Sequence, residues 1–309
     1  MRIVSLVPNA TEIVCALGLG DALVGVSHDC DYPPEIRGKP VLSQAVVGAN
    51  ARSAAIDRRI REAVHTGTSV YHLDAETLAR LNPDLILTQE LCAVCAPSYT
   101  LVTKAAKLLD SDIKIVSLEP QTLGDVLDNI RLVGELTRTE PRAQALVEGL
   151  QARIEAVAAR AAGAIRDGES LRPRVACLEW MDPIYVGGHW VPEMVDTAGG
   201  IDVLGRPGEA SRVVEWEEVV AAQPEILVLM PCGYDVSRTR AELDTLTARQ
   251  AWQEVPAVRT GRVFLTDASS YFNRPGPRLV HGLEILASVI NPGPAASFSD
   301  LPAASIEII

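Results

Sequence analysis

The feature that most constrains the fold of this chain is an alternation of short apolar strands with helical patterns. Runs rich in β-branched residues are separated by segments in which apolar residues recur every three or four positions. This alternation is typical of α/β proteins, in which helices cover a mostly parallel sheet. The strands expected in the first part of the chain cover residues 2–7, 23–27, 69–73, 84–89 and 113–118.

The first expected helix lies between the first two of these strands. Its apolar pattern covers residues 10–17 and stops at Gly18, a residue type that commonly follows a helix. The side chain of Asn9 or Thr11 is expected to cap its N-terminus, because short polar side chains accept hydrogen bonds from first-turn N–H groups.

The alternation stops in the middle of the chain. Apolar residues spaced three or four apart predict a helix over about residues 122–137, and Pro141 fits the first turn of a second helix that continues to about residue 162. The alternation then resumes, with strands expected at residues 174–180, 225–230 and 262–267. The predicted fold is α/β, with two Rossmann-like lobes of mostly parallel sheet and a helical connector, bounded at residues 1–120, 121–168 and 169–309.

An internal match supports two lobes built alike. Residues 75–89 and 216–230 share the order helix, proline, acidic residue and apolar strand, with Glu76 aligned to Glu217. This order is also a common α/β connection, so a chance match is the alternative interpretation. Two such lobes on either side of a connector form a cleft, and open parallel sheets bind ligands at the carboxyl ends of their strands.

Charge and hydropathy exclude several classes of function. The net charge of −12 argues against nucleic-acid binding, because a basic surface is needed to neutralise phosphates. No apolar stretch is long enough for a transmembrane helix, so no membrane insertion is expected. The chain reads as a strand from its second residue, without an export signal. A cytoplasmic location is therefore expected, or an extracytoplasmic one if a leader has been removed.

The candidate binding residues are those that follow the expected strands. Aromatic side chains among them suit a large, flat and partly apolar ligand, and an arginine there can pair with an anionic ligand group or anchor its own loop. The candidates are His28, Asp29, Cys30, Tyr32, Gln89, Glu90, Glu119, Trp180, His189, Trp190, Tyr271 and Arg274.

Two stretches make the chain resemble a known family. Residues 2–34, RIVSLVPNATEIVCALGLGDALVGVSHDCDYPP, and residues 83–95, PDLILTQELCAVC, resemble the cobalamin-binding substrate-binding proteins. These belong to the helical-backbone class of ABC-importer receptors, and the chain looks most like a cytosolic-type branch of them. The resemblance implies a two-lobed receptor that holds a corrinoid or a related metal chelate between its lobes. The helix from about Thr122 is then a long, rigid connection.

The resemblance also implies roles for single residues. Trp180 matches an aromatic residue of the ligand site, whereas Asp29 and Gln89 stand where family members have aromatic residues. Family members present one glutamate on each lobe to arginines of the membrane permease. Those positions match Glu76 and Glu217, the pair already found in the internal match.

Cys92 and Cys95 form a Cys-x-x-Cys pair with several open interpretations. A redox-active pair needs a helix N-terminus to lower the pKa of its first thiol, and Pro97 starts a helix only after the second cysteine. A tetrahedral zinc or iron site is another interpretation, with His28 and Cys30 as the remaining ligands. The alternatives are axial ligation of a corrinoid or haem iron by His28 or a cysteine, and thiols that line a pocket without metal.

Two classes of function follow from these features. The first is a non-enzymatic corrinoid-binding protein with an ABC permease as its partner. The alternative is a cytosolic metal-binding or redox protein that uses His28, Cys30, Cys92 and Cys95. No serine-hydrolase elbow, P-loop or dinucleotide-binding glycine motif is present, so an enzyme is not expected.

Overall fold

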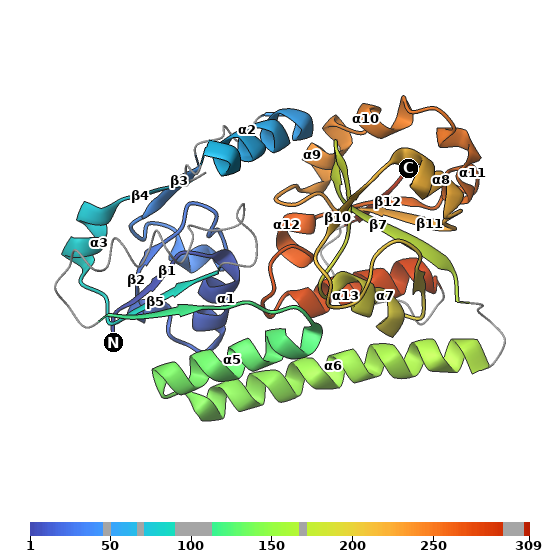
Figure 1. The fold of residues 1–309 in the computed structure, drawn as a ribbon. Helices are drawn as coiled ribbons and strands as arrows, with labels where there is room; N and C mark the ends of the chain where they lie inside the picture. The colour runs from blue at the N-terminus through green and yellow to red at the C-terminus, as the bar shows by residue number, and fades with distance from the viewer. Residues whose placement is uncertain (46–50, 67–70, 90–112, 167–171, 293–305) are drawn as a thin grey trace. The chain divides into compact units, whose positions relative to one another are not determined.

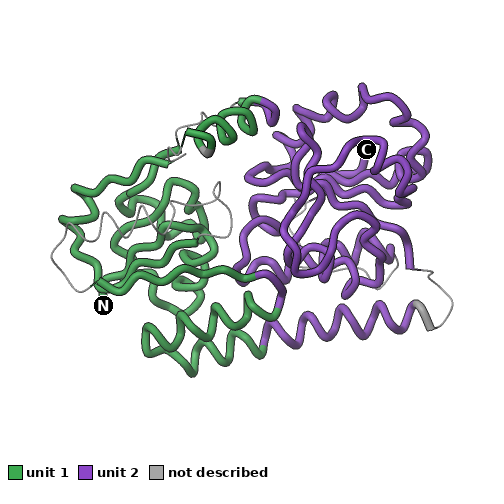
Figure 2. Tube along the Cα trace, in the orientation of Figure 1, with its two compact units in different colours: residues 1–51, 55–120, 124–148 green, residues 52–54, 121–123, 149–309 purple. Residues whose placement is uncertain are grey.

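The computed structural model describes residues 1–45, 51–66, 71–89, 113–166, 172–292 and 306–309 (Figure 1). The chain divides into two compact units (Figure 2). The first unit contains residues 1–51, 55–120 and 124–148, and the second contains residues 52–54, 121–123 and 149–309.

The first unit is built on a four-stranded sheet in which every neighbouring pair is parallel. Its strand order is β2-β1-β5-β6, so β1 and β5 occupy the centre. The central strands are buried because helices cover the sheet, which explains why they read as continuous apolar runs. The strands are β1 (Ile3–Ser5), β2 (Leu23–Val26), β5 (Leu85–Thr88) and β6 (Lys114–Ser117).

The helices of the first unit include one whose start differs from the expectation. Helix α1 begins at Pro8, with Val7 as its N-cap and no side-chain hydrogen bond at the cap. The expectation that Asn9 or Thr11 caps this helix is therefore wrong. Proline fits the first helical position because its fixed φ suits the helix and its missing N–H costs nothing there. The helices are α1 (Pro8–Ala16), α2 (Ser53–Thr66), α3 (Ala75–Leu81) and α5 (Leu123–Thr137), with 3₁₀ turns at Gly20–Ala22 and Pro34–Ile36.

A separate two-stranded sheet corrects the expected place of one strand. Strand β4 (Tyr71–Leu73) pairs antiparallel with β3 (Ser43–Ala45) instead of joining the parallel sheet. Its three residues are too few for the apolar pattern to specify a partner strand. This small sheet brings Ser43 close to His28.

The second unit contains a seven-stranded sheet with a parallel centre and antiparallel edges. Strand β7 is parallel to β11 and β9, and β12 is parallel to β11. Strand β8 and the edge strands β10 and β13 pair antiparallel with their neighbours, so this sheet is more mixed than expected. The strands are β7 (Arg174–Met181), β8 (Ile184–Val186), β9 (Ile201–Asp202), β10 (Arg212–Val214), β11 (Ile226–Leu229), β12 (Val263–Thr266) and β13 (Ile306–Ile308).

Short helices and one longer helix cover this second sheet. Helices α7 and α13 pack against each other (Figure 1). The side chain of Met194 of α7 approaches Gly282 of α13. Within the apolar core of the unit, the rings of Trp216 and Trp252 stack with their centroids 5.8 Å apart. The helices are α7 (Val191–Thr197), α8 (Trp216–Ala221), α9 (Val236–Ala241), α10 (Asp244–Thr247), α11 (Pro256–Arg259), α12 (Ala268–Tyr271) and α13 (Leu279–Ile290), with a 3₁₀ turn at Trp252–Glu254.

The connector consists of α5 and α6 (Glu140–Arg166), of which α6 has 27 residues. Close packing of α5 on α6 depends on Gly134, since a methyl group there would lie 2.4 Å from the Cβ of Ala143. Later in α6, Arg153 makes a bidentate ion pair with Glu284 of α13, at 2.7 and 2.8 Å. The compact units divide within α6, between residues 148 and 149, so the expected connector bounds of 121–168 stay a prediction.

The α/β class expected from the sequence is confirmed. The four-stranded sheet, the helical segment and the seven-stranded sheet follow one another in the predicted order. Among the described residues, no helix combines the length and the apolar character needed to cross a membrane.

Candidate functional site

The first candidate binding site is the sheet edge at the carboxyl ends of β1, β2 and β5 in the first unit. These strands are parallel, so their carboxyl ends meet at one edge of the sheet, where open α/β sheets bind ligands. Ser5 ends β1, Ser27 follows β2 and Gln89 follows β5, and all three side chains are buried. The strand ends therefore supply uncharged polar groups.

His28 is held at this edge by the small antiparallel sheet. Its Nδ1 lies 2.9 Å from the Ser43 hydroxyl, which also accepts the His28 backbone N–H at 3.2 Å. The Nε2 atom lies 3.4 Å from an Asp29 carboxylate oxygen, and the ring meets Tyr71 at a centroid distance of 5.5 Å. The imidazole is therefore fixed in position by contacts from three side chains.

Cys30 has a different set of neighbours. Its sulfur lies 2.9 Å from the Thr11 hydroxyl and 3.3 Å from the Ser27 hydroxyl. The Thr11 hydroxyl in turn donates to Ser5 at 2.8 Å. A continuous chain of hydroxyl and thiol groups thus links α1 with the ends of β1 and β2.

The other candidates of the first unit differ in exposure. Asp29 and Tyr32 are exposed, while Gln89 is buried. Glu119 is exposed and accepts a hydrogen bond from the Ser117 hydroxyl at 2.7 Å. Three predicted residues lie outside the described residues: Glu90, Cys92 and Cys95.

The predicted metal site can be followed only in part. His28 and Cys30 have separate hydrogen-bond partners, and the other two proposed ligands are not among the described residues. Within the described ranges, no three His, Cys, Asp or Glu side chains gather into a group suited to a metal ion. The zinc or iron set of His28, Cys30, Cys92 and Cys95 stays a prediction.

The second candidate edge lies at the carboxyl ends of β7 and β11 in the second unit. Trp180, near the end of β7, meets Tyr234 edge to face at a centroid distance of 5.3 Å. The backbone N–H of Cys232 donates to the Glu179 carbonyl at 3.0 Å, which joins the two strand-end segments. The indole Nε1 of Trp180 is buried and has no hydrogen-bond partner among the described residues. This N–H is a donor positioned at a strand end.

Tyr234 anchors a polar cluster that the sequence reasoning missed. Its hydroxyl donates to Glu242 at 2.8 Å, and the Arg238 guanidinium lies 3.8 Å from the ring centroid. The other Glu242 oxygen accepts the backbone N–H of Ser53 at 2.9 Å. Burial, followed by the hydrogen bond to Glu242, raises the pKa of Tyr234 well above its ordinary value. The hydroxyl therefore stays protonated and holds the ring against Trp180.

His189 is held in position through its backbone by the loop that follows β9. Its N–H donates to the Glu209 carbonyl at 2.6 Å, and its own carbonyl accepts from Gly208 at 2.9 Å. The φ of His189 is +53°, a conformation that non-glycine residues adopt rarely and that is often found at binding sites. Burial lowers the pKa of the imidazole, so the ring is neutral at neutral pH.

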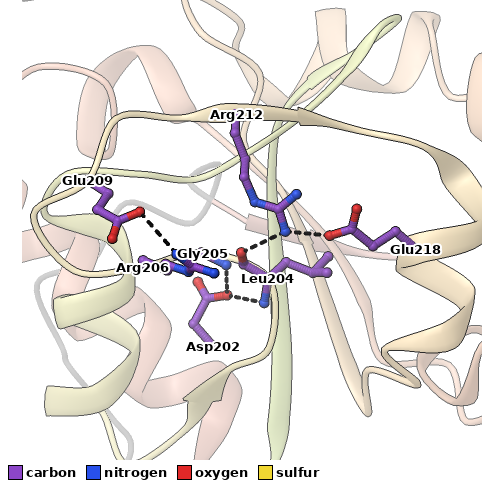
Figure 3. A network of polar contacts seen from close by, with 7 residues as sticks. All are labelled: Asp202, Leu204, Gly205, Arg206, Glu209, Arg212 and Glu218. Carbon is purple, nitrogen blue, oxygen red and sulfur yellow. Dashed lines mark hydrogen bonds and ion pairs between the residues drawn. The ribbon is translucent and has the colours of Figure 1, made fainter.

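A polar network braces the same loop (Figure 3). Asp202 Oδ1 accepts the backbone N–H groups of Leu204 and Gly205 at 3.0 and 2.7 Å. Farther along, Arg212 contacts both the Leu204 carbonyl and the Glu218 carboxylate. The network therefore fixes both ends of the loop that positions His189.

The remaining candidate residues of the second unit are buried or half-buried. Trp190 is 6% exposed, and its indole N–H donates to the Phe272 carbonyl at 2.9 Å. Tyr271 is also buried, with the His281 ring at a centroid distance of 6.2 Å. Arg274 is half-buried. Trp190 thus has its only donor satisfied inside the protein.

Glu76 and Glu217 occupy equivalent places in the two units. Each lies in the first turn of a helix, α3 and α8 respectively, and each is exposed. A first-turn carboxylate also interacts favourably with the helix dipole, so this position alone does not require a partner.

Comparison with known proteins gives three relatives of similar length. An uncharacterized ABC transporter substrate-binding lipoprotein, YvrC, from Bacillus subtilis is 26% identical over 94% of this chain and 80% of its own. A vitamin B12-binding protein from Vibrio cholerae is 25% identical over 92% of this chain and 86% of its own. The solved structure of the periplasmic heme-binding protein RhuT from Roseiflexus matches with a TM-score of 0.69 and 25% identity, over 94% and 97% of the two chains.

A family model described as periplasmic binding protein matches residues 3–270. The match covers the sheet of the first unit, the helical segment, and strands β7 to β12 of the second sheet. This agrees with the resemblance found in residues 2–34 and 83–95. The chain therefore belongs to the periplasmic binding protein family.

Proposed function

We propose that this protein is the substrate-binding protein of an ABC importer and that its ligand is a corrinoid. The family match over residues 3–270 supports a binding protein rather than an enzyme. The relatives include an ABC transporter substrate-binding lipoprotein and a vitamin B12-binding protein. The RhuT structure belongs to a heme-binding protein, so haem is the competing ligand.

Each strand-end edge, taken by itself, offers groups that suit part of a large ligand with an apolar face and polar edges. Trp180 offers an aromatic surface, and its buried indole N–H has no hydrogen-bond partner among the described residues. The first unit contributes hydroxyl, thiol and imidazole groups at His28 and Cys30, which suit neutral polar groups. The observation that carries the proposal is the family match over residues 3–270. Zinc or iron bound by the protein itself is not part of it.

The described residues give the redox alternative no specific observation in its favour. Its central pair, Cys92 and Cys95, lies outside the described ranges, and the relatives are transport proteins by name. We also place the working site outside the cytoplasm, because YvrC is a lipoprotein and RhuT is periplasmic. An ABC permease is then the partner that receives the ligand.

Titration of the purified protein with cyanocobalamin, dicyanocobinamide and haemin tests the ligand class. We expect both corrinoids to bind with a dissociation constant of about 1 μM or lower, a strength that isothermal calorimetry resolves. A change in the visible spectrum of dicyanocobinamide on binding provides a second readout. The corrinoid proposal is wrong if neither corrinoid gives heat or a spectral change, or if only haemin binds.

A variant of Trp180 connects the binding to the site. Trp180→Phe keeps an aromatic surface but removes the unpartnered N–H, and Trp180→Ala removes both. We expect the Phe variant to bind cyanocobalamin several-fold more weakly and the Ala variant at least tenfold more weakly. Trp252→Phe is the matched control, because Trp252 is buried against Trp216 in the core. Its affinity should equal that of the wild type.

A further inference from the structure

Asn9 carries a buried amide for which the described residues provide no hydrogen-bond partner. Its exposed fraction is 0%, and neither its Nδ2 nor its Oδ1 atom has a hydrogen-bond partner among the described residues. Buried amides in native proteins are nearly always hydrogen-bonded, so an unpaired one requires a physical explanation. The unmet groups are one acceptor and one donor-bearing nitrogen in the same side chain.

The amide lies at the open end of a helix. Asn9 is the second residue of α1, which has nine residues and no side-chain cap at Val7. The Cα–Cβ bonds of a helix tilt toward its N-terminus, so the side chain of Asn9 leaves the helix on the side of the uncapped end. The N–H groups of Asn9 and Ala10 belong to the first turn and find no acceptor within the helix. Donors of the backbone and the side chain are therefore gathered at one place.

The sheet topology puts this helix end where ligands of such sheets bind. In the order β2-β1-β5-β6, the chain leaves β1 for β2 on one side, while β5 lies on the other. The strand order thus reverses at β1, and α1 starts directly beyond the carboxyl end of that strand. Open parallel sheets bind their ligands at such reversal points.

The neighbouring groups select a neutral ligand group over an anion. The Thr11 hydroxyl is already engaged with Ser5 and Cys30, so the Asn9 amide is the group left to satisfy. A carboxylate ligand would offer Asn9 Oδ1 no donor. A primary carboxamide offers one donor side and one acceptor, matching both unmet atoms of Asn9.

We propose that Asn9 and the first turn of α1 form a subsite for a primary carboxamide on the rim of the ligand. The inference rests on the proposed corrinoid-binding function and sharpens it. Corrinoids carry carboxamides around their ring, whereas haem carries carboxylates. Asn9 thereby acts as a residue that favours corrinoids over haem.

The test uses two ligands that differ in this group and one variant that preserves shape. Dicyanocobinamide has rim carboxamides, and dicyanocobyrinic acid has carboxylates in their place. We expect the wild type to bind the carboxamide form at least tenfold more tightly. Asn9→Leu, nearly isosteric but apolar, should lose about tenfold in affinity for dicyanocobinamide and change little toward dicyanocobyrinic acid.

The ligand-free stability of the same variant separates a binding role from a structural one. Because Asn9→Leu removes two unpaired buried atoms, its melting temperature without ligand should equal or exceed that of the wild type. Asn129→Leu is the matched control, since Asn129 on α5 also has a buried Nδ2 without a described partner. Its affinity for dicyanocobinamide should not change.

The outcomes distinguish this inference from the proposed function. Wild-type protein that binds dicyanocobinamide, with unchanged affinity in Asn9→Leu, overturns the subsite and leaves the function standing. Equal binding of the amide and carboxylate ligands, or a lower melting temperature of Asn9→Leu with unchanged affinity, overturns it as well. Wild-type protein that binds no corrinoid overturns both proposals.

Discussion

Asp202 is a carboxylic acid held where a neutral amide fits better. Its Oδ1 accepts two backbone N–H groups, while its Oδ2 is buried without a described partner. A methyl group at Gly205 would lie 2.9 Å from this Oδ2 and 2.5 Å from the Gly187 carbonyl oxygen, so both acceptor oxygens border the same point. Burial raises the pKa of Asp202, and the two backbone hydrogen bonds only partly oppose this.

The sign of the resulting pH dependence follows from the raised pKa. The folded state holds the Asp202 proton more tightly than the unfolded state, where the pKa is about 3.9. The contribution of Asp202 to stability is fully present below that value. It is lost as the pH rises through the raised pKa of the folded state. At neutral pH, the buried carboxylate therefore destabilises the second unit.

Asp202→Asn should accordingly stabilise the protein at neutral pH. The amide keeps the Oδ1 acceptor, supplies a donor in place of Oδ2 and carries no charge. We expect a gain of about 1 kcal/mol in the free energy of unfolding at pH 7. The gain should shrink toward zero when the pH falls to about 4. Urea unfolding at several pH values measures this gain, with Asp235→Asn, at the exposed N-cap of α9, as the control. A constant difference across all pH values would contradict the explanation.

Two glycines of the helical segment differ in what surrounds them. Gly149 of α6 is exposed, and a Cβ at this position would have no atom within 4 Å. Gly134 of α5 is buried, and its Cβ would lie 2.4 Å from that of Ala143. Glycine weakens a helix interior by about 0.5–1 kcal/mol relative to alanine, unless close packing requires it.

Alanine at these two positions should therefore have opposite effects. Gly149→Ala is expected to raise the free energy of unfolding by about 0.5–1 kcal/mol. Gly134→Ala should lower the free energy of unfolding by about 1–3 kcal/mol, because the added methyl group forces α5 away from Ala143 in the first turns of α6. Thermal and urea unfolding of the two variants supply the comparison. Shifts of the same sign would show that the packing of α5 on Ala143 does not decide the role of Gly134.

For the whole molecule, the proposed partner is a permease that contacts one exposed glutamate on each unit. Lysine at both positions, Glu76→Lys with Glu217→Lys, would replace attraction to permease arginines by repulsion. We expect uptake of labelled cyanocobalamin to fall at least tenfold in cells that carry only this variant. The affinity of the purified variant for cyanocobalamin should not change.

Glu140→Lys provides the matched control for this experiment. Glu140 is also an exposed glutamate in the first turn of a helix, α6, and has no counterpart in the internal match. Its variant should transport normally. Normal uptake by the double variant would remove Glu76 and Glu217 as docking residues.

Several parts of the fold followed from local patterns, and others did not. The apolar runs at 84–89 and 225–230 predicted β5 and β11 because buried parallel strands are apolar throughout. The antiparallel strands β8, β10 and β13 have three residues each, and so short a run carries no readable period. Pro8 was the available signal for the start of α1, and it outweighed Asn9 and Thr11 as cap residues.

By itself, the sequence determined the α/β class, the order of the two sheets about a helical segment, and Trp180 as an aromatic residue at a strand end. Each of these depends on residues close together in the chain. Only the tertiary structure decided that Tyr234 holds Trp180, that Ser43 holds His28 and that the Asn9 amide finds no partner among the described residues. Whether a buried polar group finds a partner depends on contacts between distant segments, and no local pattern records those contacts.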